Sequence, residues 1–117
     1  TVRDQLVPQD GLYTLVTRDS DAERRRIIGA IAEVLVAPER PSAVIDAIAA
    51  PTTHLITLTI TEKGYCHDPA SGKIDWTHPD IIHDLGNLAA PKSAVGYLAA
   101  GLAARMERGG GPITVMS

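Results

Sequence analysis

The sequence predicts an α/β fold in which helices pack on a mostly parallel β-sheet. Segment 53–60 (THLITLTI) is almost continuously apolar, which is typical of a strand covered on both faces. The order strand, excursion, helix, strand over residues 53–117 is typical of a βαβ crossover, whose two strands run parallel. Phe is absent and aromatic residues make up 3% of the chain, so Ile, Leu, Val and Ala must build the core.

Length and charge limit what the chain can be. At 117 residues it has the length of one domain. Its net charge of −3, from 11 basic and 14 acidic residues, gives no field that would attract nucleic acid or an anionic membrane. The single cysteine, Cys66, cannot form an internal disulfide, which favours a reducing, cytoplasmic setting. No apolar stretch approaches the ~20 residues needed to span a bilayer.

Two segments before the first helix have strand character. Residues 11–18 (GLYTLVTR) predict a short strand, and the charged segment 19–25 (DSDAERR) predicts a solvated turn. Segment 26–37 (RIIGAIAEVLVA) is ambiguous, because its Ile, Val and Ala suit a buried strand while its length and Glu33 suit a helix. We interpret most of it as strand.

The first helix is predicted over residues 43–50 (AVIDAIAA). Ser42 can cap its N-terminus and Pro51 ends it. Strand 53–60 follows at once. The helix and the strand therefore form the first half of an alternating α/β pattern.

The C-terminal half supplies the crossover. Residues 66–76, which include DPASGK, predict a surface excursion in the form of a hairpin. Residues 78–85 predict a short helix or turn with Pro79 at its first position. The strongest helix signal covers residues 91–109, where apolar residues recur at helical spacing. Residues 112–117 (PITVMS) predict the last strand.

Strands 53–60 and 112–117 are predicted to be parallel neighbours whose carboxyl ends share one rim of the sheet. Thr61 to Lys63 and Ser117 would lie at that rim. Ligands of open α/β sheets bind just outside such strand ends. A strand also ends in charges simply because it reaches water, so Glu62 and Lys63 alone leave both interpretations open.

Other motifs give weaker signals. There is no G-x-G-x-x-G and no P-loop, since the glycine run at 109–111 ends a helix and precedes a strand. Cys66 and the histidines lack metal-ligand spacing, so no metal site is predicted. Ser93 is interpreted as a helix cap, and Arg24 to Arg26 as part of a solvated, self-neutralised loop.

Five blocks in order resemble the long-chain mannitol dehydrogenase family. They are QDGLYTL (9–15), LTITEKGYC (58–66), HPDIIHDL (78–85), PKSAVG (91–96) and RGGGPITVMS (108–117). This family includes mannitol 2-dehydrogenase and the fructuronate and tagaturonate reductases. The resemblance covers nearly the whole chain, which makes it more specific than one short motif.

The resemblance implies that residues 1–117 are a partial N-terminal dinucleotide-binding domain with a Rossmann-like fold. The family's glycine-rich loop would precede Thr1, and its catalytic, mostly helical domain would be absent. The parent protein would then be an enzyme that transfers a hydride between NAD and a polyol or ketose, or between NAD and a hexuronate or keto-uronate. This chain would carry no catalytic residue and would be inactive alone.

The resemblance also gives the strand end a role. Cofactor-binding residues would be Ile60, Thr61, Glu62, Lys63 and Ser117, with backbone groups of the first two meeting the cofactor and the charged pair at its nicotinamide end. Gly64 would let the chain turn sharply away. Two alternatives carry no chemistry: a free-standing α/β nucleotide-binding module, and an interaction or assembly domain.

Overall fold

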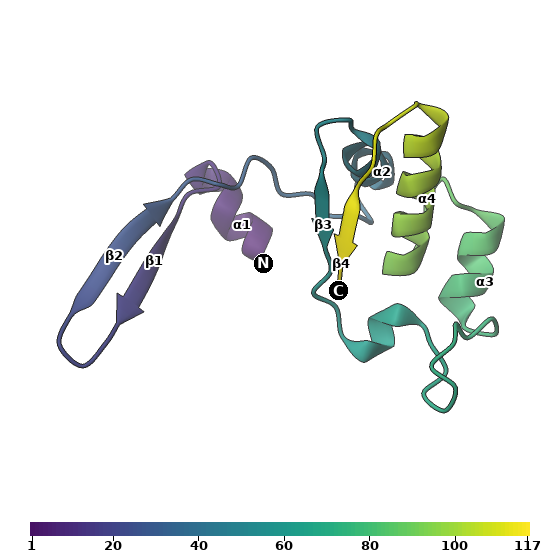
Figure 1. Ribbon diagram of the computed structural model, residues 1–117, viewed down its shortest axis with the longest axis horizontal. Helices are drawn as coiled ribbons and strands as arrows, with labels where there is room; N and C mark the ends of the chain where they lie inside the picture. The colour runs from purple at the N-terminus through teal and green to yellow at the C-terminus, as the bar shows by residue number, and fades with distance from the viewer. The chain divides into compact units, whose positions relative to one another are not determined.

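The computed structural model describes all residues from 1 to 117 and divides into two compact units, Thr1–Val36 and Ala37–Ser117. Figure 1 traces both units from the N-terminus in purple to the C-terminus in yellow. No helix combines the length and apolarity that crossing a membrane requires. The two units are described separately below.

The N-terminal unit is a short helical segment followed by a β-hairpin. Helix α1 covers Val2–Leu6 and the 3-10 helix η1 covers Val7–Gln9. Strands β1 (Tyr13–Arg18) and β2 (Glu23–Ile28) pair antiparallel, with Tyr13 opposite Ile28 and Arg18 opposite Glu23. Asp19 accepts the backbone N–H groups of Asp21 and Ala22, which tightens the connecting turn.

Two predictions for this unit are wrong in detail. The predicted turn 19–25 is shorter, because the Asp19 bonds let β2 begin at Glu23. The predicted strand 26–37 is extended only as far as Ile28, and residues 29–36 have no regular structure. The strand ends at Ile28 because its partner strand ends there. Strand β1 begins at Tyr13, which pairs with Ile28, so no residue of β1 is left to pair with residues beyond Ile28.

The C-terminal unit contains the predicted βαβ crossover. Strands β3 (Leu55–Thr57) and β4 (Thr114–Met116) are parallel, with Leu55 opposite Thr114 and Thr57 opposite Met116. The parallel pairing of these two segments is therefore confirmed. Each strand is shorter than predicted, and β3 is half-buried only at Ile56, so it is not covered on both faces. Figure 1 shows the pair in teal and yellow.

The C-terminal unit also contains three α-helices. They are α2 (Pro41–Ala49), α3 (Pro79–Gly86) and α4 (Ala94–Glu107), and the 3-10 helix η2 covers Glu62–Tyr65. Helices α2 and α4 make the largest helix contact. They approach so closely that a Cβ on Gly101 would stand 2.5 Å from the Ile48 side chain. Glycine at this position lets the two backbones meet.

The helix caps differ in part from the sequence prediction. Ser93 caps α4, since its Oγ accepts the backbone N–H of Gly96 at 2.9 Å, as predicted. Ser42 does not cap α2. Helix α2 begins two residues earlier than predicted, at Pro41, with Arg40 at the N-cap and no side-chain cap. Proline suits a first helical position because its φ is already helical and it lacks the N–H that would need a cap.

One buried arginine ties the crossover together. Arg105 of α4 is 3% exposed and its guanidinium donates only to backbone carbonyls. The acceptors are Ala50 and Gly111 at 2.7 Å, Ile48 at 3.2 Å and Pro112 at 3.4 Å. These carbonyls belong to the end of α2 and to the loop before β4. Arg105 therefore fixes where β4 begins.

Candidate functional site at the carboxyl ends of β3 and β4

The candidate site is the rim where the two parallel strands end. The backbone N–H of Leu58 donates to the Met116 carbonyl at 2.8 Å, and this is the last bond of the ladder. Thr59 and Ile60 continue beyond it without a backbone partner. Their N–H and C=O groups are therefore free for a polar ligand at this edge.

The turn after the strand is a 3-10 helix. In η2 the N–H of Gly64 donates to the Thr61 carbonyl at 2.8 Å, and that of Cys66 donates to the Lys63 carbonyl at 3.2 Å. The residue in the left-handed conformation is Cys66, with φ of 50°, and not Gly64 as the predicted sharp turn would need. Gly64 serves close packing instead, because a Cβ there would lie 3.3 Å from the Ile60 Cβ.

The five predicted cofactor-binding residues follow the two strand ends, Ile60 to Lys63 after β3 and Ser117 directly after β4. Ile60 is half-buried, whereas Thr61, Glu62, Lys63 and Ser117 are exposed. Ser117 follows Met116, the residue bonded to Leu58, so the ends of the two strands are adjacent. No ion pair joins Glu62 to Lys63. Each side chain is free to meet a separate group of a ligand, and cofactor binding by this set stays a prediction.

A buried carboxylate, Asp84, organises the neighbouring helices. Asp84 of α3 is 3% exposed. Its Oδ2 accepts the Ser93 hydroxyl at 2.5 Å and the Ser93 N–H at 3.0 Å, and its Oδ1 accepts the Lys92 N–H at 2.7 Å. His83 Nδ1 lies 3.0 Å from Oδ1. Burial alone would raise the pKa of this carboxyl, but the hydrogen bonds from Ser93, His83 and Lys92 outweigh it and lower the pKa to about 2.

Sequence reasoning identified the Ser93 cap but missed Asp84. A signal was present, since Ile81 and Asp84 are three residues apart and therefore share one helix face. Both are buried. Gly96 is part of the same arrangement, because any Cβ there would collide with the Asp84 carboxylate.

The Asp84 cluster has the wrong geometry for nucleophilic catalysis. The Ser93 hydroxyl donates to the Asp84 carboxylate, whose pKa of about 2 makes it too weak a base to take the hydroxyl proton. Burial raises the pKa of the Cys66 thiol, and the Asp80, Asp84 and Asp75 carboxylates raise it further, so the thiol stays protonated at neutral pH. No group of three or more His, Cys, Asp or Glu residues could hold a metal ion.

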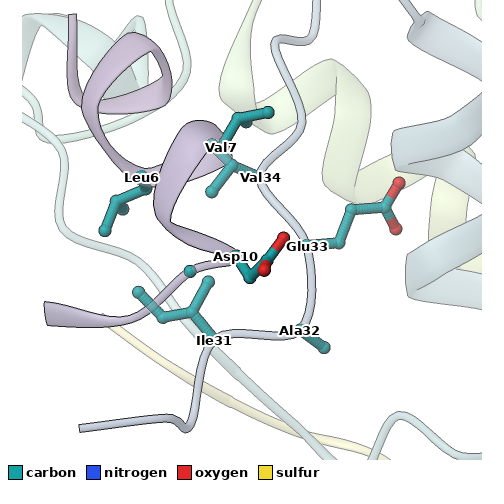
Figure 2. A pocket seen from close by; sticks show the side chains of 8 residues that line it. Leu6, Val7, Asp10, Ile31, Ala32, Glu33 and Val34 are labelled. Atoms are coloured by element: carbon teal, nitrogen blue, oxygen red, sulfur yellow. The ribbon is translucent and has the colours of Figure 1, made fainter. Parts of the chain in front are cut away.

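The N-terminal unit has a separate pocket of about 280 Å³. Figure 2 shows it between the helical segment that carries Leu6 and Val7 and the extended stretch from Ile31 to Val34. Its lining is aliphatic apart from two acids, Asp10 and Glu33. None of the predicted site residues lines it.

The whole chain matches one family model. Residues 1–117 match the family described as "Mannitol dehydrogenase Rossmann domain". Mannitol 2-dehydrogenase of Pyricularia oryzae is 40% identical over 119 residues, which cover 100% of this chain and 24% of the relative. D-mannonate oxidoreductase of Escherichia coli is 43% identical over 116 residues, which cover 97% of this chain and 24% of the relative.

Solved structures have the same fold. The ternary complex of Pseudomonas fluorescens mannitol 2-dehydrogenase with NAD and D-mannitol is 40% identical to this chain, with a TM-score of 0.89. A D-sorbitol dehydrogenase in substrate-free form is 32% identical, with a TM-score of 0.91. Each match covers 99% of this chain and 24% of the other. The predicted Rossmann-like fold class is confirmed, and the chain spans about a quarter of the length of these proteins.

Proposed function

The chain belongs to the mannitol dehydrogenase family, within its Rossmann domain, and from this membership we propose that it is part of an NAD-dependent oxidoreductase acting on a sugar alcohol. Residues 1–117 would form part of the dinucleotide-binding domain, and the rest of a longer polypeptide would complete the enzyme. The 40% identity to a mannitol 2-dehydrogenase solved with NAD and D-mannitol supports both the cofactor and the substrate class.

The single observation that carries this proposal is the rim of β3 and β4. Parallel strands end there side by side, and Thr59 and Ile60 extend past the ladder with free backbone groups. A dinucleotide binds at such a rim because its ribose and amide groups need hydrogen-bond partners that a sheet edge offers. When bound, NAD supplies the acceptor for a hydride, and its reduced form supplies the donor.

The chain's own residues would bind and orient the cofactor. Backbone groups of Ile60 and Thr61 would contact it, with Ser117 beside them from the neighbouring strand. Glu62 and Lys63 would lie at the nicotinamide end, where a carboxylate can accept from a hydroxyl and an ammonium can donate to an oxygen. Their exposure and the lack of an ion pair between them leave both charges available for these contacts.

The substrate has one alternative within the same chemistry. The E. coli relative is named for D-mannonate, a sugar acid, and its identity to this chain is 43%. A hexuronate or keto-uronate substrate is therefore the second candidate. Both classes present a secondary alcohol that loses a hydride and a proton, so this domain could serve either. The cytoplasm suits such metabolism and agrees with the single buried Cys66.

The test is nicotinamide absorbance with the longer polypeptide that contains this chain. We expect NAD reduction with D-mannitol, or NADH oxidation with D-fructose, and no turnover by residues 1–117 alone. D-mannonate is the matched sugar acid, and faster turnover of it would favour the second candidate. NAD binding without turnover of any polyol or sugar acid would instead indicate a binding module without chemistry, and would contradict the proposal.

A further inference from the structure

We propose that a pocket formed by the segments before α2 and α4 and by the second half of α3 binds the oxyanion group of a small organic molecule, either a carboxylate or a phosphate. The pocket, here named the His83–Lys92 pocket, measures about 410 Å³ and lies wholly within the C-terminal unit. Sites for small molecules occupy about 300 Å³ or more, so its size suffices. It shares no residue with the β3–β4 rim, and this proposal does not rest on the proposed function.

Three polar side chains with unused hydrogen-bonding groups line the pocket. Lys92 and Asn87 are exposed, and neither side chain makes a hydrogen bond or an ion pair. His83 is half-buried and uses only its Nδ1, so its Nε2 is free. No Asp or Glu lines the pocket. An ammonium, an amide NH₂ and an imidazole without a neighbouring carboxylate in the lining favour an anion as the ligand.

A single oxygen atom positions both basic residues. Oδ1 of Asp84 accepts the backbone N–H of Lys92 at 2.7 Å and lies 3.0 Å from Nδ1 of His83. Asp84 has a pKa of about 2, so it is ionised at neutral pH and its oxygens can only accept. His83 therefore carries a proton on Nδ1, and the opposite nitrogen, Nε2, is the one left for a ligand.

The buried acid does not itself line the pocket. Asp84 is 3% exposed, and its two oxygens are bonded to Ser93, Lys92 and His83. It holds the two basic residues in place without placing a carboxylate oxygen against the ligand. A preorganised pair of this kind loses little conformational entropy when an anion binds.

The rest of the lining is apolar. It consists of Ala37, Pro38, Pro41, Ala90 and Pro91, with the ring of Tyr97. The Tyr97 hydroxyl donates to the Ala37 carbonyl at 3.0 Å, which ties the segment before α2 to α4. The three prolines have a fixed φ, so these walls are already restricted before a ligand enters. An apolar lining with few polar groups is typical of sites for organic molecules, which favours an organic anion over a free ion.

A neutral sugar alcohol fits this pocket less well than an anion. Its hydroxyls could bond to Asn87 and His83, but they would leave the charge of Lys92 without an opposite charge. Hydrogen bonds between two charged groups are roughly twice as strong as those between neutral groups. The pocket should therefore distinguish an anion from a neutral molecule of the same shape.

Titrations of the longer polypeptide with three molecules of one carbon skeleton test the proposal. D-glycerate carries a carboxylate, glycerol 3-phosphate carries a phosphate, and glycerol carries neither. Saturation-transfer-difference NMR gives the Kd of each for the parent and for Lys92→Met and Asn87→Ala. Lys92 bonds Asp84 only through its backbone, so Lys92→Met should fold like the parent. Lys73→Met is the matched control, since Lys73 is an exposed lysine outside the pocket.

We expect at least one of the two anions to bind the parent about tenfold more tightly than glycerol, and the tighter anion identifies the preferred group. Lys92→Met should raise the Kd of that anion about tenfold and Asn87→Ala about threefold, whereas Lys73→Met should leave it unchanged. Equal binding of glycerol and both anions, or an unchanged Kd in Lys92→Met, would overturn the proposal. The absence of saturable binding by either anion would overturn it as well. The measurement needs no turnover, so a failure of the proposed function would leave its outcome intact.

Discussion

The hydroxyl of Ser93 donates to the carboxylate of Asp84 at 2.5 Å, so the residue that caps α4 is itself held by a buried acid from α3. The backbone N–H groups of Lys92 and Ser93 donate to the same carboxylate. One ionised side chain therefore joins two helices and completes a helix N-terminus. Its charge state should control how firmly the two helices are joined.

The free energy of unfolding should decrease as the pH falls through the range in which the Asp84 carboxylate becomes protonated. The pKa of this carboxyl is about 2 in the folded chain against an ordinary value of 3.8. A lowered folded pKa contributes stability that is present above pH 3.8 and is lost as the pH falls toward 2. The contribution is roughly 2 kcal/mol. Urea unfolding of Asp84→Asn should show this loss already at neutral pH and a flatter pH dependence between 4 and 2. Asp46→Asn, an exposed acid, is the control and should behave like the parent.

Replacing Arg105 by lysine should destabilise the C-terminal unit by about 2–3 kcal/mol. An ammonium cannot reach the four carbonyls that the guanidinium satisfies, so some of them would be left buried and unpaired. Arg108→Lys is the control, because Arg108 bonds only the exposed Asp46 and should change stability by at most about 1 kcal/mol. Denaturant melts that show equal midpoints for the two variants would contradict the role given to Arg105.

Gly101→Ala should lower the free energy of unfolding by about 1–3 kcal/mol, although alanine favours helix. The added Cβ would stand 2.5 Å from Ile48 and push α2 away from α4. Gly86→Ala is the matched control, since nothing lies within 4 Å of a Cβ there. In thermal melts, Gly101→Ala should have a lower Tm than the parent protein, and Gly86→Ala should have a Tm equal to or higher than that of the parent. If Gly101→Ala proves as stable as Gly86→Ala, the helices are not packed this closely.

Glu62→Gln or Lys63→Ala in the longer polypeptide should reduce kcat/KM on the order of tenfold or more, about 1.4 kcal/mol of transition-state binding. Both side chains are exposed, so folding should not change. Steady-state kinetics with NAD and the polyol would measure the effect. Lys73→Ala is the control, an exposed lysine in the excursion. Parental kcat/KM and NAD affinity in both variants would mean that the charges only end a strand.

The order of elements in the C-terminal unit could be predicted from the sequence because its signals are local. Periodic apolar residues located α4, Pro79 located the start of α3, and the alternation of strand and helix fixed the parallel pairing of β3 with β4. The predicted position of Thr61 to Lys63 and Ser117 at the strand ends follows from the same pairing, whereas their cofactor-binding role comes from the family resemblance. The residues that follow a strand show where the strand ends, but they do not show which ligand binds at that end.

The remaining features depend on distant partners. Residues 29–36 have the composition of a strand, but a strand also needs a second strand to pair with. The ladder with β1 ends at Ile28, so residues 29–36 have no such partner strand. The bonds of Asp84 and Arg105 join residues that a linear pattern does not connect, since Arg105 reaches back 57 positions to Ile48. The sequence predicts a sharp turn at Gly64, because glycine is the most permissive residue, whereas the left-handed residue in the structure is Cys66.

The β3–β4 pairing also has a consequence in time. Leu55 pairs with Thr114, 59 positions further along the chain (114 minus 55). Closing so long a loop costs entropy before the short ladder repays it, whereas the helices can form locally. Docking α2 on α4 closes a loop of similar length but forms a larger contact than the two three-residue strands do, so we expect it to come first and the strands to meet late in folding. The rim exists only after the two strands have paired. A ligand that binds at the rim therefore binds only to chains in which the β3–β4 pairing has already formed.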